Sequence, residues 1–133
     1  MSQQHRHLHP YHAVDQFHEA FGLPRASQPQ LPDQPVRQLR QALLAEEFTE
    51  YQTAEQANDL VEIADALADI IYIACGTAVA YGIPLDRVFD EVHASNMSKL
   101  GPDGRPIYRE DGKVLKPTGW RPPDISSVLY GDG

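Results

Sequence analysis

Two pairs of acidic residues stand out in this chain, Glu47-x-x-Glu50 and Glu62-x-x-Asp65. Each pair lies in a stretch that favours helix, and a step of three residues puts two side chains on one helix face. On neighbouring antiparallel helices the two pairs would bring four carboxylates together. Like charges at that spacing repel one another unless a cation lies between them. The spacing therefore predicts a site for a divalent metal ion.

The charges around these pairs are unevenly distributed. No Lys or Arg occurs between Arg40 and Arg87, a stretch that contains Glu46, Glu47, Glu50, Glu55, Asp59, Glu62, Asp65, Asp69 and Asp86. Six of the 11 basic residues follow Met97: Lys99, Arg105, Arg109, Lys113, Lys116 and Arg121. An acidic centre followed by a basic segment suits a metal-bound phosphate compound. The alternative is an acidic surface that only keeps the protein soluble.

The elements that must position these acids are helices. Hydrophobic spacing and the turn residues predict helices over 13–21, 33–57, 60–81 and 84–100, with Asp33 as an N-cap and Gly82 as a C-terminal stop. The segment 101–123 is too rich in Gly and Pro for a helix. Ile107-Tyr108 and Val114-Leu115 flank Asp111-Gly112 and predict a small hairpin. The expected fold class is all-α, a four-helix bundle with an irregular C-terminal wrap.

Helical geometry puts the acids where a core would be expected. On the second predicted helix an apolar stripe of Val36, Leu39 and Leu43 continues into Glu46, Glu47 and Glu50. The third predicted helix is apolar nearly all round, so we expect it to be central and mostly buried. Its charged stripe consists of Glu62, Asp65 and Asp69. One such stripe normally faces water, but two without basic partners favour a metal site.

The ligand types indicate which metal would bind. Carboxylate oxygens are hard donors that suit Mg²⁺, with Mn²⁺ as a possible substitute. A carboxylate-bridged di-iron bundle needs Glu-x-x-His pairs, and neither acidic helix contains His. Zinc is disfavoured because His and Cys ligands are missing from the same helices.

Composition excludes several function classes. The 133 residues and the net charge of −8 predict one acidic globular domain over 13–125 that binds neither nucleic acid nor an anionic membrane. The single Cys75, predicted to be a core residue, fits a reducing compartment, and we expect a cytoplasmic protein. Residues 1–12 are expected to form a flexible arm with His5, His7, His9 and His12, and 126–133 a loose tail.

The motifs resemble those of a known family. The pattern Glu46-Glu47-x-x-Glu50 followed by Glu62-x-x-Asp65, together with Asn96-Met97-Ser98-Lys99, is similar to the MazG-like all-α nucleoside triphosphate pyrophosphohydrolases. This superfamily includes dimeric dUTPases and phosphoribosyl-ATP pyrophosphohydrolase. The resemblance covers about residues 33–124. It implies a MazG-like four-helix bundle that forms a homodimer or a dimer of dimers.

The resemblance also implies residue roles. Glu47, Glu50, Glu62 and Asp65 would be the Mg²⁺ ligands, and Glu46 would be the base that orients or deprotonates water. The expected substrate contacts are Asn96, Lys99, Asp69, Lys113, Lys116 and Arg109. Tyr72 is expected to pack in the core, with a base pocket as the alternative, and Trp120 to anchor the C-terminal segment.

The expected activity is Mg²⁺-dependent hydrolysis of a (deoxy)nucleoside triphosphate to the monophosphate and pyrophosphate. Among substrates dUTP is favoured by the resemblance alone. One alternative is a hydrolase of the same fold that acts on phosphoribosyl-ATP or another pyrophosphate compound. Another is a non-catalytic helical protein whose acidic face binds cations or a basic partner.

Overall fold

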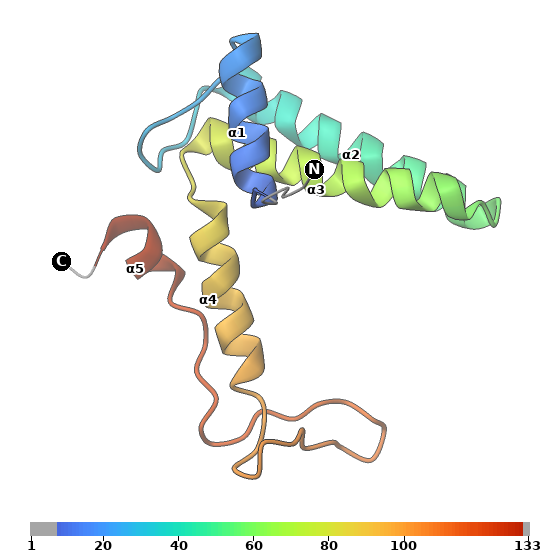
Figure 1. Ribbon diagram of the computed structural model, residues 1–133, viewed down its shortest axis with the longest axis vertical. Coiled ribbons are helices and arrows are strands. Elements are labelled where there is room, and N and C mark those ends of the chain that lie inside the picture. The colour runs from blue at the N-terminus through green and yellow to red at the C-terminus, as the bar shows by residue number, and fades with distance from the viewer. Residues whose placement is uncertain (1–7, 132–133) are drawn as a thin grey trace, which may run out of the picture. The chain divides into compact units, whose positions relative to one another are not determined.

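The structure is a computed structural model that describes residues 8–131. Its helices are α1 (Pro10–Phe21), α2 (Gln34–Gln56), α3 (Leu60–Tyr81), α4 (Leu85–Met97) and α5 (Ile125–Tyr130) (Figure 1). Within the described range the only β-pairing is two isolated bridges, so the predicted all-α class is confirmed. The chain divides into two compact units, residues 1–85 and 86–133, and each is described by itself.

Helix α3 is the centre of the first unit and packs against both α1 and α2. Its ends are defined by local chemistry, of which the Gly82 stop was predicted from the sequence. The Asp59 side chain accepts a hydrogen bond from Glu62 N (3.1 Å), and Gly82 adopts the left-handed conformation with φ 71°. Small and medium side chains form the core and allow the helices to approach closely: Val14, Ala54, Ala66, Cys75, Ala78, Val79 and Ala80. The predicted core position of Cys75 is confirmed.

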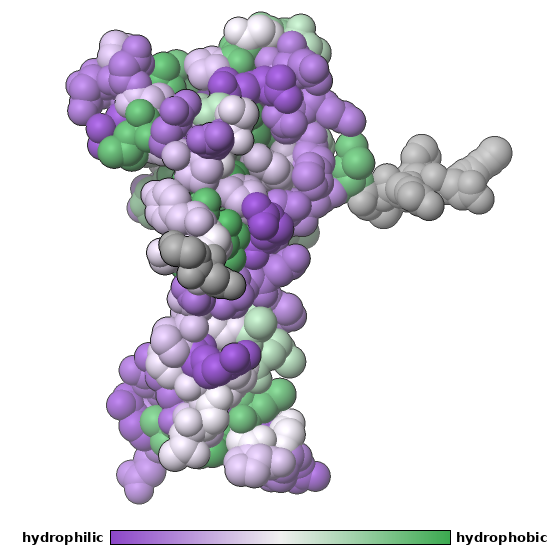
Figure 2. All heavy atoms as spheres, turned by 90° about the vertical axis from the view of Figure 1, so that its left-hand side faces the viewer, coloured by the Kyte–Doolittle hydropathy of each residue, from purple (hydrophilic) through white to green (hydrophobic). Residues whose placement is uncertain are grey.

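Burial along α3 is uneven, which corrects the expectation of a mostly buried helix. The stretch from Cys75 to Ala80 is buried except for Thr77, but Leu60 is 78% exposed and Val61 76% exposed. Leu67 and Ile71 are also exposed, and apolar side chains reach the surface at several places (Figure 2). A three-helix unit covers only one end of such an apolar helix. By length and composition α3 alone among the described helices could cross a membrane, a test that soluble core helices also pass.

Two helix boundaries differ from the sequence prediction. Helix α1 begins at Pro10 rather than residue 13, because His9 acts as the N-cap and its Nδ1 accepts a hydrogen bond from Tyr11 N (3.0 Å). His5 and His7 of the predicted arm lie outside the described residues. Helix α4 ends at Met97, not at residue 100. There the Ser98 hydroxyl donates to Ser95 O (2.7 Å), and the chain turns.

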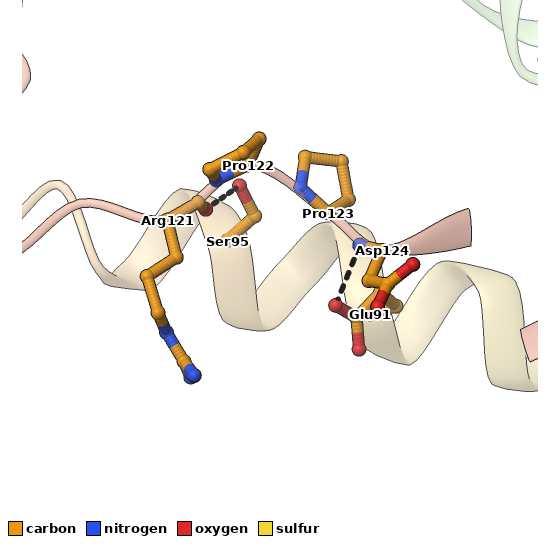
Figure 3. A pocket seen from close by; sticks show the side chains of 6 residues that line it. All are labelled: Glu91, Ser95, Arg121, Pro122, Pro123 and Asp124. Carbon is orange, nitrogen blue, oxygen red and sulfur yellow. Dashed lines mark hydrogen bonds between the residues drawn. The ribbon is translucent and has the colours of Figure 1, made fainter. Parts of the chain in front are cut away.

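In the second unit the irregular segment after α4 returns along that helix. The Ser95 hydroxyl donates to Arg121 O (2.7 Å), and Asp124 N donates to Glu91 Oε2 (2.8 Å) (Figure 3). These residues line a pocket of about 490 Å³. The predicted hairpin is confirmed by the bridge between Tyr108 and Val114, whose turn contains Gly112 at φ 89°.

The C-terminal tail predicted to be loose contains α5. Asp124 caps this short helix, because its carboxylate accepts hydrogen bonds from both Ser127 N (3.2 Å) and the Ser127 hydroxyl (2.8 Å). These bonds lower the pKa of Asp124. The capping pattern is visible in the sequence as Asp-x-x-Ser, but six residues give too little periodicity for a helix prediction.

A partly buried polar contact joins α2 to α3 beside α1. Arg40 of α2 donates from Nε to Thr77 Oγ1 (3.1 Å) and from Nη2 to Ile73 O (2.9 Å) of α3. The guanidinium crosses α3 at Gly76, beside the buried His18 of α1. His18 Nδ1 lies 2.8 Å from Pro24 O, and since a carbonyl can only accept, the imidazole donates. This contact fixes the register of α2 against α3.

We predict that Gly76→Ala destabilises the protein. A Cβ at this position would collide with Arg40 Nη2 and lie 3.0 Å from His18 Nε2. Overpacking costs about 1–3 kcal/mol, which outweighs the gain of up to about 1 kcal/mol in helix propensity. Urea unfolding should therefore show a lower midpoint. The control is Gly119→Ala, where a Cβ meets nothing within 4 Å. A midpoint for Gly76→Ala at or above the wild-type value would contradict the role of Arg40.

Candidate metal centre

Three of the predicted acids come together on α2. One carboxylate oxygen from each of Glu46, Glu47 and Glu50 lies within 4.8 Å of the other two. Glu46 and Glu50 are exposed and Glu47 is half-buried. The helix places them together because residues three and four apart are surface neighbours. Glu62 and Asp65 are not members of this close group in the described structure.

Glu47 connects this group to the acids of α3. Its pKa is raised above the usual value, first by desolvation and then by the negative charges of Glu50, Asp69, Glu46 and Asp65. The carboxylate oxygen Oε2 is shielded from solvent and has no hydrogen-bond partner among the described residues. A shielded oxygen surrounded by like charges is costly in the metal-free protein. It is the most crowded acid of the site.

Glu62 is connected to the site through a pocket. A cavity of about 260 Å³ is lined by Thr49, Glu50, Thr53, Ala54, Ala57, Asp59 and Glu62. Both threonine hydroxyls donate back along α2, to Ala45 O and Thr49 O (each 3.1 Å), so their oxygens can still accept. Glu50 thus belongs both to the close group and to the pocket wall that Glu62 shares. The close group and this cavity thus link Glu47, Glu50 and Glu62, while Asp65 is linked through its charge on Glu47.

The donor set fits a hard divalent cation. Within residues 8–131, no basic side chain forms an ion pair with any of the acids Glu46, Glu47, Glu50, Glu62, Asp65 and Asp69. Arg40, the last basic residue before them in the sequence, donates its hydrogen bonds to α3 instead. Carboxylate oxygens are the donors that Mg²⁺ and Mn²⁺ prefer. The unpartnered Oε2 of Glu47 is the position where such an ion would relieve the largest electrostatic cost.

The role of Arg40 was not predicted from the sequence, where this residue marks only the border of the stretch without basic residues. The available signal was its spacing, because Arg40, Leu43, Glu47 and Glu50 follow each other at helical steps on one face. Burial lowers the pKa of the Arg40 guanidinium. Arg40 therefore stabilises the face from which the acids project, seven residues before Glu47.

The predicted substrate contacts belong to the second unit, except Asp69. Asn96 is exposed near the end of α4, while Lys99 follows the helix in a turn where its N–H donates to Asn96 O (3.1 Å). Lys99 therefore lies beyond the helix, which was predicted to continue to residue 100 but ends at Met97. Their roles in substrate binding stay predictions.

Two of the predicted cationic contacts already have partners within the second unit. Arg109 forms an ion pair with Asp111, which raises the pKa of Arg109 and lowers that of Asp111. Lys116 Nζ lies 4.3 Å from the centre of the Trp120 ring. Trp120 is half-buried in the Pro-rich segment, in keeping with an anchor. Lys113 donates its backbone N–H to Asp111 (3.1 Å).

Comparison with known proteins identifies the family. The chain is 32% identical over 110 residues to the uncharacterized protein L479 of Acanthamoeba polyphaga mimivirus. The aligned segment covers 80% of this chain and 41% of that protein. The chain thus spans less than half the length of this relative. The phosphoribosyl-ATP pyrophosphohydrolase family matches residues 14–96, a range that contains most of α1, all of α2 and α3, nearly all of α4 and every acid of the candidate metal centre. The chain belongs to the phosphoribosyl-ATP pyrophosphohydrolase family.

Proposed function

We propose that this protein hydrolyses a (deoxy)nucleoside triphosphate to the monophosphate and pyrophosphate in a Mg²⁺-dependent reaction, with dUTP as the favoured substrate. Family membership supports pyrophosphohydrolase activity on a pyrophosphate compound. The observation that carries the metal dependence is the crowded Glu47, whose pKa is raised and whose Oε2 has no partner in the described structure. A polyphosphate is the natural ligand of a divalent ion held this way.

Each acid has a distinct part in this proposal. Glu47, Glu50, Glu62 and Asp65 would hold Mg²⁺ or Mn²⁺, which supplies neutralisation of charge on phosphate oxygens and a lower pKa of bound water. Glu46 is exposed beside Glu47, so it is free to orient the attacking water and accept its proton. Asp69 contributes negative charge at Glu47 and extends the acidic stripe by one turn.

The second candidate substrate is phosphoribosyl-ATP. The description of the matching family favours it, and the same carboxylates would serve, because the bond to be broken lies between phosphoryl groups in both compounds. A non-catalytic acidic protein that binds cations or a basic partner is the remaining alternative. The chemistry of the acids is common to all three, so a substrate panel must decide.

We further propose that the protein is a cytoplasmic homodimer or dimer of dimers. The support is the apolar surface at the N-terminal half of α3, where Leu60, Val61, Leu67 and Ile71 are exposed. Apolar area of this kind on a small protein is costly in water and is characteristic of subunit contacts. The net charge of −8 argues against binding to nucleic acid or anionic lipid.

We predict that Mg²⁺ stabilises the fold and that Glu47→Gln has opposite effects with and without the metal. At a concentration about 100 times the dissociation constant, Mg²⁺ would add about 2.7 kcal/mol. Glu47→Gln removes a repelled charge, so the metal-free variant should melt at a higher temperature than wild type. In Glu47→Gln, most of the increase in melting temperature that Mg²⁺ causes in wild type should be lost. The measurement is the melting temperature with EDTA and with Mg²⁺.

The higher melting temperature expected for metal-free Glu47→Gln follows from proton linkage. The raised pKa of Glu47 means that the folded protein binds more protons than the unfolded chain between the two pKa values. Stability contributed by this group therefore falls as pH rises through that window, and the cost is fully present above the folded-state pKa. Glu19→Gln is the control, because this α1 carboxylate is 70% exposed and outside the acidic group. An unchanged Mg²⁺ response in Glu47→Gln would rule out Glu47 as a ligand.

We predict pyrophosphate release from at least one nucleotide in a panel of dUTP, the other deoxynucleoside triphosphates, UTP and phosphoribosyl-ATP. The products with Mg²⁺ or Mn²⁺ are scored for pyrophosphate against phosphate. Substitution of a residue that only supports a metal ligand typically lowers activity by roughly 10–100-fold. Glu47→Gln should lower activity by more than this, because it removes a ligand itself. Equal activity in Glu47→Gln and wild type would contradict the assigned role. If no compound in the panel is cleaved, the proposed function is wrong.

We predict that the exposed face of α3 mediates self-association. Light scattering should give a mass of at least twice the 14.8 kDa chain, and Leu67→Lys should lower it by placing a charge in the contact. The control is Leu31→Lys, because Leu31 is 69% exposed but lies in the loop before α2. A wild-type mass of one chain at all concentrations tested would refute the proposal.

A further inference from the structure

Three aromatic rings form an exposed cluster on the first unit. Phe17 and Phe21 of α1 lie with ring centroids 4.3 Å apart, and Phe17 meets Tyr72 of α3 edge-on at 5.7 Å. The residues are 37%, 67% and 41% exposed, respectively. Rings gathered at a surface leave a large apolar area in water. The cluster is therefore either covered by a second molecule or used to bind a planar ligand.

The cluster adjoins the acidic stripe of α3. Tyr72 follows Asp69 by three residues and Asp65 by seven, so all three share one helix face. Seven residues correspond to a rise of about 10 Å. Asp65 and Asp69 are also the two α3 acids whose charges act on Glu47 of α2. The rings thus lie one to two helical turns from the carboxylates of the candidate metal centre.

The opposite end of the acidic stripe has a different chemistry. The cavity of about 260 Å³ near the start of α3 is lined by hydroxyl, methyl and carboxylate groups and by no ring. Its carboxylates, Glu50, Asp59 and Glu62, suit a cation and its water. A base needs a flat apolar face, which this cavity does not provide. The chemistry along α3 therefore changes from carboxylates near the α2–α3 turn to aromatic rings beside α1.

We propose that Phe17, Phe21 and Tyr72 form the surface on which the base of the nucleotide stacks. This inference rests on the proposed function, because it takes the metal-bound polyphosphate as the other half of the ligand. The distance of about 10 Å along α3 suits a nucleotide that extends from its phosphates to its base. Stacking acts on any π-face, so the rings supply affinity and little discrimination between bases. Base selectivity must come from other groups.

The test is binding of ligands that cannot be cleaved, measured by calorimetry with Mg²⁺. The ligands are α,β-imido-dUTP, α,β-imido-dATP and inorganic tripolyphosphate, which has no base. Tyr72→Leu should weaken both nucleotide analogues by about tenfold or more and leave tripolyphosphate unchanged. Tyr72→Phe keeps the ring and should bind all three ligands as wild type does. Phe21→Leu is the second variant, because Phe21 is 67% exposed and its loss spares the core.

Several results would overturn the inference. One is wild-type affinity of Tyr72→Leu and Phe21→Leu for both nucleotide analogues; another is an equal loss of tripolyphosphate binding, which indicates structural damage. A change in oligomeric mass with unaltered nucleotide binding would show that the rings belong to a subunit contact. Wild type that binds tripolyphosphate but neither nucleotide would also refute it. The failure of the proposed function is a separate result, namely no pyrophosphate release from any nucleotide in the substrate panel.

Discussion

Electrostatic repulsion at Glu47 is the interaction on which the candidate site depends. The packing of α2 against α3 holds this carboxylate among four other acids, and no described cation pairs with any of them. Such an arrangement lowers the stability of the metal-free protein. It persists because contacts elsewhere hold the helices together: the Arg40 bonds to α3, the Asp59 cap and the buried small residues. The fold thus compensates for a locally unfavourable site, as functional sites commonly require.

The same helix pair explains how one surface could serve both halves of a nucleotide. Asp65 and Asp69 of α3 place negative charge at Glu47 of α2, and Tyr72 follows them on the same face of α3, where it meets Phe17 of α1. Gly76 matters here, because the missing side chain lets Arg40 cross α3 without spreading the helices. The candidate metal ligands and the rings are therefore held by helices, which favours a preorganised site.

Much of the first unit could be predicted from the sequence. The bounds of α3 followed from its apolar run and the Gly82 stop, and the position of the acids followed from helical periodicity. The contact of Arg40 with Gly76 could not be predicted, because it depends on the register between two helices. The exposure of Leu60 and Val61 was also not predicted. An apolar pattern indicates that a helix face should be covered, but it does not show whether the same chain covers it.

In the second unit local chemistry prevailed over periodicity. Helix α4 stops at Met97 although the pattern continues to Leu100, because the Ser98 hydroxyl and the following turn satisfy the free carbonyls. The hairpin at Asp111-Gly112 was predictable from its turn residues, whereas α5 was too short to detect. The partners of Arg109 and Lys116 were likewise invisible in the sequence, since they depend on the path of an irregular segment.

The most direct test of the account is a carboxyl NMR titration of Glu47 with and without Mg²⁺. We expect a pKa above the ordinary value for glutamate in the metal-free protein, and a marked fall in this pKa when Mg²⁺ is added, because a bound cation reverses the local field. Replacing Mg²⁺ by paramagnetic Mn²⁺ should broaden the signals of Glu47, Glu50, Glu62 and Asp65 first. An ordinary Glu47 pKa that Mg²⁺ does not change would contradict the central claim.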